Sequence, residues 1–133
     1  MKRVLGALLS VAGLLMVQVS PASARDFDLK FEPGKSYGVM SNSVVRGDRD
    51  HYYFGANPGQ MLTVGISSVE DNAVVELYVK SGGEWFPVEQ PVDTRVLYGA
   101  LPPSDGGQYR LTVGGTRGNA TYDMFVGIAV VGR

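Results

Sequence analysis

The chain has 133 residues, a formal net charge of −1 and no cysteine. Without cysteine there can be no disulfide, thiolate metal site or cysteine nucleophile, so an exported form must be held together by core packing alone. A chain with slightly more acidic than basic residues also lacks the basic surface that nucleic-acid binding requires.

The first 24 residues have the pattern of a secretory signal peptide. Lys2 and Arg3 precede an apolar run over residues 4–19, and Ala22-Ser23-Ala24 is typical of a cleavage site. The run is short for a membrane span, so we expect cleavage after Ala24 and a periplasmic protein without membrane attachment. Residues 25–133 then form one domain of 109 residues with 10 basic and 13 acidic side chains, a net charge of −3. Such a charge favours encounter with a basic partner.

The mature sequence predicts strands and no helix. The expected strands cover residues 27–31, 37–45, 51–56, 61–67, 73–80, 84–86, 95–100, 108–113 and 121–130. Apolar residues alternate with polar ones within most of these segments, and turn residues recur roughly every 8–12 positions. This pattern predicts an all-β fold, a single antiparallel, jelly-roll-like β-sandwich of about eight or nine strands. The last segment alternates most cleanly, so we expect it in the middle of a sheet.

Residues able to carry catalysis are few. His51 is the only histidine, which excludes a multi-histidine metal site, and no Gly-x-Ser-x-Gly nucleophile motif accompanies it. Asp48 and Asp50 form an acid pair in principle or a partial calcium site, but the other oxygen ligands of a calcium loop are absent. A turn role for Asp48 and a strand-opening role for Asp50 are preferred. We therefore expect no enzyme, metal or cofactor.

Two motifs carry a family resemblance. The first is the strand Asp50-His51-Tyr52-Tyr53-Phe54 followed by the turn Asn57-Pro58-Gly59-Gln60, and the second is Leu101-Pro102-Pro103-Ser104 leading to Tyr109. With the last strand, they resemble the pre-peptidase C-terminal domain-like β-sandwiches, and among these the periplasmic inhibitors of g-type lysozyme. The resemblance extends over residues 25–128. It implies a monomer or homodimer that binds a lysozyme and occludes its glycan cleft with surface loops, with the lysozyme class left open.

The resemblance also implies which residues contact the partner. Ser104 and Tyr109 belong to one loop, and Thr116, Arg117 and Asn119 belong to the loop before the last strand. Arg117 would pair with an acidic residue of the lysozyme cleft, while the first loop would supply hydrogen bonds and packing. This site requires the two loops to be neighbours in space.

The alternative hypothesis is a non-catalytic module that binds carbohydrate or cell wall. Trp85 and Phe86 follow a glycine-rich turn and, if exposed, would stack on a sugar ring together with surface tyrosines. Burial is the preferred interpretation of Trp85, because it is the only tryptophan of a domain without disulfides.

Overall fold

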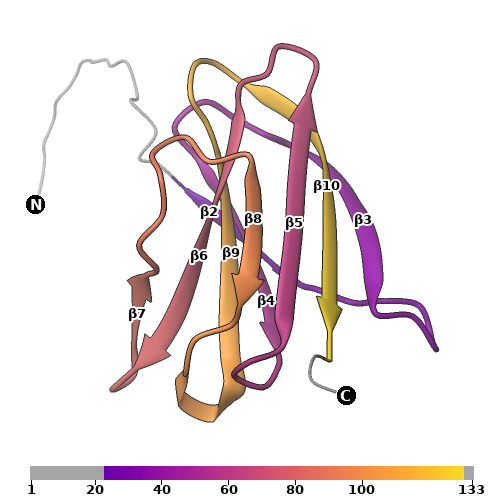
Figure 1. The fold of residues 1–133 in the computed structure, drawn as a ribbon. Coiled ribbons are helices and arrows are strands. Elements are labelled where there is room, and N and C mark those ends of the chain that lie inside the picture. The colour runs from indigo at the N-terminus through magenta and orange to yellow at the C-terminus, as the bar shows by residue number, and fades with distance from the viewer. Residues whose placement is uncertain (1–22, 131–133) are drawn as a thin grey trace, which may run out of the picture.

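Two β-sheets pack face to face in the computed structural model, which describes residues 23–130. The signal-peptide prediction for residues 1–22 lies outside this range. One sheet has the order β3-β10-β5-β8 and faces the viewer in Figure 1; the other has the order β2-β4-β9-β6-β7. The strands are β2 (Ala24–Asp28), β3 (Tyr37–Val44), β4 (Arg49–Gly55), β5 (Met61–Ser68), β6 (Ala73–Ser81), β7 (Glu84–Pro87), β8 (Val96–Ala100), β9 (Gln108–Gly115) and β10 (Ala120–Ala129), with a short 3-10 turn η1 (Asp105–Gly107) before β9.

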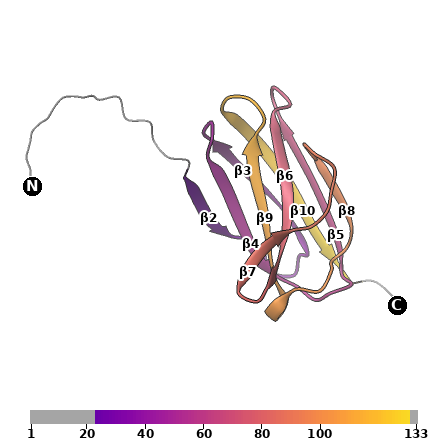
Figure 2. The same ribbon diagram turned by 90° about the vertical axis from the view of Figure 1, so that its left-hand side faces the viewer.

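The strand order of β3 to β10 is that of a jelly roll. Successive strands change sheets at every connection except the β6–β7 hairpin, and all pairs among them are antiparallel. β2 joins the five-stranded sheet as a parallel edge strand next to β4. Figure 2 shows the connection from β7 to β8 crossing between the layers. The predicted all-β sandwich is therefore confirmed.

The core lies between the sheets and follows the alternation of the sequence. Leu62, Val64 and Ile66 of β5 are buried, as are alternate residues of β10, which lies between β3 and β5. The central place predicted for the last strand is confirmed. The first strand is displaced from its expected range of 27–31, because its ladder is set by a parallel pairing with β4 that begins at Ala24 and Arg49.

The buried carboxylate of Asp50 pairs with Arg25 within one sheet and is bonded to Tyr122 of the other sheet. Asp50 is fully buried (0% exposed) and lies 2.9 Å from Arg25 Nε, while the hydroxyl of Tyr122 in β10 donates to Asp50 Oδ2 at 2.7 Å. The Tyr52 and Tyr122 hydroxyls are 2.7 Å apart. Burial raises the pKa of Tyr122, and its hydrogen bonds to Tyr52 and Asp50 raise it further. Asp50 thus has the structural role preferred from the sequence.

Candidate protein-binding loops

The two loops predicted to form one site lie at opposite ends of the sandwich. Residues 104–107 precede β9 and residues 116–119 follow it, and Figure 1 shows these loops at the bottom and the top of the molecule. β9 has eight residues. At ~3.4 Å per residue its ends are about 24 Å apart. The prediction of one surface containing both loops is therefore wrong.

Ser104 and Tyr109 are bonded within the protein. The Ser104 hydroxyl accepts a hydrogen bond from the Lys80 amide at 2.7 Å and donates to the carbonyl of Gln108. The ring of Tyr109 is 0% exposed and stacks on Phe54 with centroids 5.5 Å apart, and burial raises its pKa. A ring without exposed surface cannot contact a partner, so the assignment of Tyr109 to a binding surface is corrected: it packs in the core and supports the loop.

The loop of residues 116–119 is exposed and its backbone is held from below by Asn72. The Asn72 side chain, only 2% exposed, donates from Nδ2 to the carbonyls of Arg117 at 2.9 Å and Asn119 at 3.0 Å. The backbone carbonyl of Asn72 accepts a hydrogen bond from the Thr116 amide at 2.9 Å. Gly118 adopts a φ of 67°, a conformation that favours glycine. The backbone of this exposed loop is therefore held by three hydrogen bonds to Asn72.

Two neighbouring turns contact the same loop. The Arg117 guanidinium donates from Nη2 to the carbonyl of Glu70 at 2.7 Å, and Asn119 Oδ1 accepts from the Arg46 amide at 2.6 Å. Residues 45–48, 69–72 and 116–119 thus form one surface, here named the Arg117 loop cluster. The sequence analysis missed Asn72, although an Asp-Asn pair in a turn is a signal for side-chain bonds to nearby backbone.

Arg117 carries a charge that no carboxylate of the described residues neutralises, a property it shares with Arg46 and Arg49 near the same surface but not with Arg95 and Arg25. Arg95 pairs with Asp71, with Nε and Oδ1 2.6 Å apart, and Arg25 pairs with Asp50. Among residues 23–130 no carboxylate lies within ion-pair distance of Arg117, whose guanidinium is bonded only to a backbone carbonyl. Its charge is therefore available to a carboxylate supplied by a partner.

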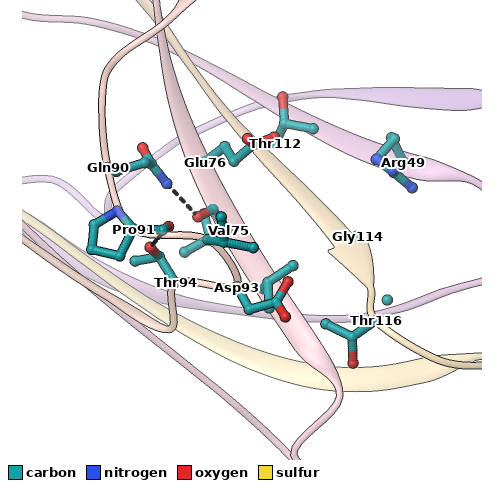
Figure 3. A pocket seen from close by; sticks show the side chains of 13 residues that line it. Arg49, Val75, Glu76, Gln90, Pro91, Asp93, Thr94, Thr112, Gly114 and Thr116 are labelled. Carbon is teal, nitrogen blue, oxygen red and sulfur yellow. Dashed lines mark hydrogen bonds between the residues drawn. The ribbon is translucent and has the colours of Figure 1, made fainter.

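A groove of about 290 Å³ adjoins the Arg117 loop cluster on the outer face of the five-stranded sheet. Figure 3 shows it between the β7–β8 connection, represented by Gln90, and the end of β9 near Thr116. Gln90 Nε2 donates to the carbonyl of Val75 at 3.0 Å, which anchors one wall on β6. At the other end Arg49 covers Gly114 so closely that a Cβ there would lie 3.1 Å from its side chain. The groove and the Arg117 loop cluster are continuous, because Thr116 belongs to both.

His51 lies on the outer face of β4 and contacts a hydroxyl of the neighbouring strand β9. Its Nδ1 lies 2.8 Å from the Thr112 hydroxyl, which is buried and also accepts a hydrogen bond from Arg110 Nε. Burial lowers the pKa of His51, and the positive charge of Arg110 lowers it further. No group of three possible metal ligands occurs in the described range. The geometry at His51 is that of a structural histidine on a strand.

Trp85 differs from the preferred interpretation. Its ring lies on the outer face of the five-stranded sheet and is partly exposed, near Tyr53 and Arg110, so the expected burial is wrong. Phe86, its neighbour in β7, is 46% exposed.

No helix found in residues 23–130 combines the length and the apolar character needed to cross a membrane.

Comparison with known proteins gives matches among solved structures alone; no family model and no curated protein matches the sequence. A jelly-roll sandwich of this size is shared with three inhibitors. PliG of Aeromonas hydrophila, a periplasmic lysozyme inhibitor of g-type lysozyme, is 23% identical over 80% of this chain and 99% of its own, with a TM-score of 0.59. PliG of Salmonella Typhimurium is 23% identical over 78% of this chain and 97% of its own, with a TM-score of 0.60.

A mutant of PliG from Escherichia coli gives the same result, with 24% identity, 80% and 98% coverage and a TM-score of 0.57. The three matches show that this chain has the fold of these inhibitors over almost the whole of their length. The resemblance predicted from the two sequence motifs is confirmed at the level of the fold.

Proposed function

We propose that this protein is a periplasmic, non-catalytic inhibitor that binds a lysozyme, with a g-type lysozyme as the first target to test. The observation that carries the proposal is the match over 97–99% of three g-type lysozyme inhibitors. A match of this extent means that nearly every residue of these inhibitor domains aligns with a residue of this chain. The two sequence motifs resemble the same group of inhibitors and support the same function.

The proposed contact surface is the Arg117 loop cluster with its adjoining groove. A lysozyme cleft carries catalytic carboxylates, and Arg117 offers an arginine without a carboxylate partner in the described range, at the tip of a convex loop. A guanidinium–carboxylate pair makes two parallel hydrogen bonds and is strong when water is excluded. Inhibition would follow because the loop occupies the place of the glycan.

The order of the loop contributes to the affinity. Since the Asn72 amide already fixes the backbone at Arg117 and Asn119, little conformational entropy is lost when the partner binds. A stable interface requires roughly 800 Å² from each partner, so we place the rest of the contact on the turns at 45–48 and 69–72 and on the rim of the groove. The predicted net charge of −3 would speed encounter with a basic lysozyme.

A turbidity assay with bacterial cell walls tests the function and the site together. The mature protein is titrated against g-, c- and i-type lysozymes, and we expect stoichiometric loss of lysis with the g-type enzyme. Arg117→Ala should weaken inhibition by at least tenfold, because truncating one member of a desolvated charge pair costs on the order of 2–5 kcal/mol. The matched control is Lys35→Ala, an exposed cation on the connection before β3, which should inhibit like the wild type.

Outcomes of this assay separate the site from the function. Inhibition that survives Arg117→Ala unchanged would reject the Arg117 loop cluster and leave the function standing. No effect of the wild-type protein on any of the three lysozyme classes, at micromolar excess, would reject the inhibitor proposal itself.

A further inference from the structure

A second surface, far from the Arg117 loop cluster, carries aromatic and cationic side chains that the inhibitor proposal does not use. Trp85 in β7 and Tyr53 in β4 have ring centroids 5.7 Å apart at an angle of 56°. The Arg110 guanidinium lies 4.1 Å from the centroid of Tyr78 and 5.3 Å from that of Trp85, and Lys80 Nζ lies 5.4 Å from Trp85. These contacts fix the rings before any ligand arrives.

A groove of about 420 Å³ lies beside this group, at the end of the sheet where β4 finishes and β9 begins. Trp85 lines one part of it and residues 28–30 another, with Tyr53 and Gln108 also in its lining. Its volume falls within the range of roughly 300–1,000 Å³ that is usual for small-molecule sites. We name it the Trp85 groove.

Two glycines line the Trp85 groove where the ends of β4 and of the turn before β9 approach each other. Gly55 and Gly107 both line it, and the Gly107 carbonyl accepts a hydrogen bond from the Ala56 amide at 2.9 Å. Gly107 has a φ of 65°, and a Cβ placed on it would lie 2.7 Å from the carbonyl oxygen of Ala56. A side chain at this position is therefore excluded by backbone conformation and by contact with Ala56, so glycine is required for the shape of the turn that lines the groove.

Charged side chains of both signs surround the groove, and this mixture limits the kind of ligand that it can bind. The cations of this surface are Lys30, Lys80 and Arg110, and the anions are Asp26, Asp28 and Glu76, with Glu84 and Asp105 on the turns beside it. A polyanion such as nucleic acid requires a predominantly basic surface, and an apolar ligand would leave these charges without water or partner. A neutral ligand with one apolar ring face can pack on the aromatic rings. Its hydroxyl groups can form hydrogen bonds with the polar and charged side chains around them.

We propose that the Trp85 groove binds a neutral oligosaccharide, with one sugar ring packed against Trp85 and hydroxyl groups bonded to Asp28 and Gln108. The C–H face of a pyranose ring is apolar and matches the face of an indole ring, while its rim of hydroxyls both donates and accepts hydrogen bonds. Asp28 offers acceptors, and the Gln108 amide offers its Nε2 as a donor while its Oε1 accepts from Lys80 Nζ at 3.3 Å. The inference does not depend on the lysozyme proposal, because it uses a different face of the protein.

Trp85 itself provides the readout, since it is the only tryptophan of the chain. Its fluorescence is recorded while the mature protein is titrated with a chitin, a cellulose or a starch-derived tetrasaccharide, and separately with a sulfated polysaccharide of the heparin type. We expect a saturable change in emission with at least one neutral tetrasaccharide and none with the sulfated chain. No change with any neutral tetrasaccharide at millimolar concentration, or a response to the sulfated chain alone, would overturn the proposal.

Variants that keep the reporter test the assignment of the groove. Asp28→Ala and Gln108→Ala retain Trp85 and should each weaken the affinity by about three- to tenfold, the effect of one lost hydrogen bond. The matched control is Tyr98→Ala on the other sheet, where the tyrosine is 74% exposed, and its affinity should equal that of the wild type. Wild-type affinity in both groove variants would reject the site. Trp85→Ala, checked for a native melting curve, should lose retention on insoluble chitin or the corresponding polysaccharide.

Discussion

Substitution of Asn72 by alanine tests whether the binding loop is held in place before the partner arrives. The change removes the side-chain amide that donates to the carbonyls of Arg117 and Asn119, and it does not touch Arg117 itself. Two net hydrogen bonds at about 1 kcal/mol each give a loss of roughly 2 kcal/mol in the free energy of unfolding. For a domain of about 100 residues, this corresponds to a fall in Tm of the order of 10 °C.

The same substitution should weaken inhibition, although Asn72 is buried and cannot contact a lysozyme. A loop that is mobile in the free protein must be ordered on binding, at about 0.5–1.5 kcal/mol for each immobilised side chain. We expect an inhibition constant about three- to tenfold weaker than that of the wild type, measured by cell-wall turbidity at a temperature where the variant is fully folded.

Asn57→Ala is the control for this experiment, because Asn57 is an exposed asparagine in the turn between β4 and β5, at the other end of the sandwich. It should melt and inhibit like the wild type. Wild-type melting and wild-type inhibition in Asn72→Ala would refute the argument that this amide orders the loop. A fall in Tm with unchanged inhibition would refute the step from loop order to affinity.

Further predictions concern the buried network and the opposite loop. Asp50→Ala should lower the free energy of unfolding by about 3 kcal/mol, because it removes three hydrogen bonds, two from Arg25 and one from the Tyr122 hydroxyl, at about 1 kcal/mol each; an unchanged urea midpoint would contradict this. Burial raises the pKa of Tyr122 and of Tyr109, so the folded protein keeps these phenols neutral above pH ~10 while the unfolded chain ionises them. The unfolded state then binds fewer protons, and stability should fall by about 1.4 kcal/mol per pH unit for each buried tyrosine above that pH; a constant urea midpoint between pH 9 and 11 would disprove it. Ser104→Ala should lower the Tm through the lost bond to the Lys80 amide and leave lysozyme inhibition intact; loss of inhibition in the folded variant would return this loop to the binding surface.

Much of the fold was predictable because burial follows strand alternation. The alternation of Val75 and Leu77 with polar residues placed β6 correctly, with both side chains in the core. The displaced first strand was not predictable, because its limits depend on a parallel pairing with a strand far along the chain. Strand alternation is a local signal, whereas pairing between distant segments is decided by the whole fold.

Two errors about single residues could have been avoided with the same local signal. Tyr109 shares its face with Leu111 and Val113, so the alternation of β9 already directed it into the core. The hairpin turn at Gly82 pairs Lys80 with Trp85, which places both on the face opposite Val79. The separation of the two candidate loops also had a local signal, because they flank the strand predicted at 108–113 and so had to lie at its opposite ends.

Direct binding to a g-type lysozyme, measured by titration calorimetry with the mature protein, tests the central claim most plainly. We expect heat that saturates at one inhibitor per lysozyme, and a clearly weaker isotherm for Arg117→Ala than for Lys35→Ala. Absence of binding heat at two temperatures, with folded protein and active enzyme, would contradict the proposed function.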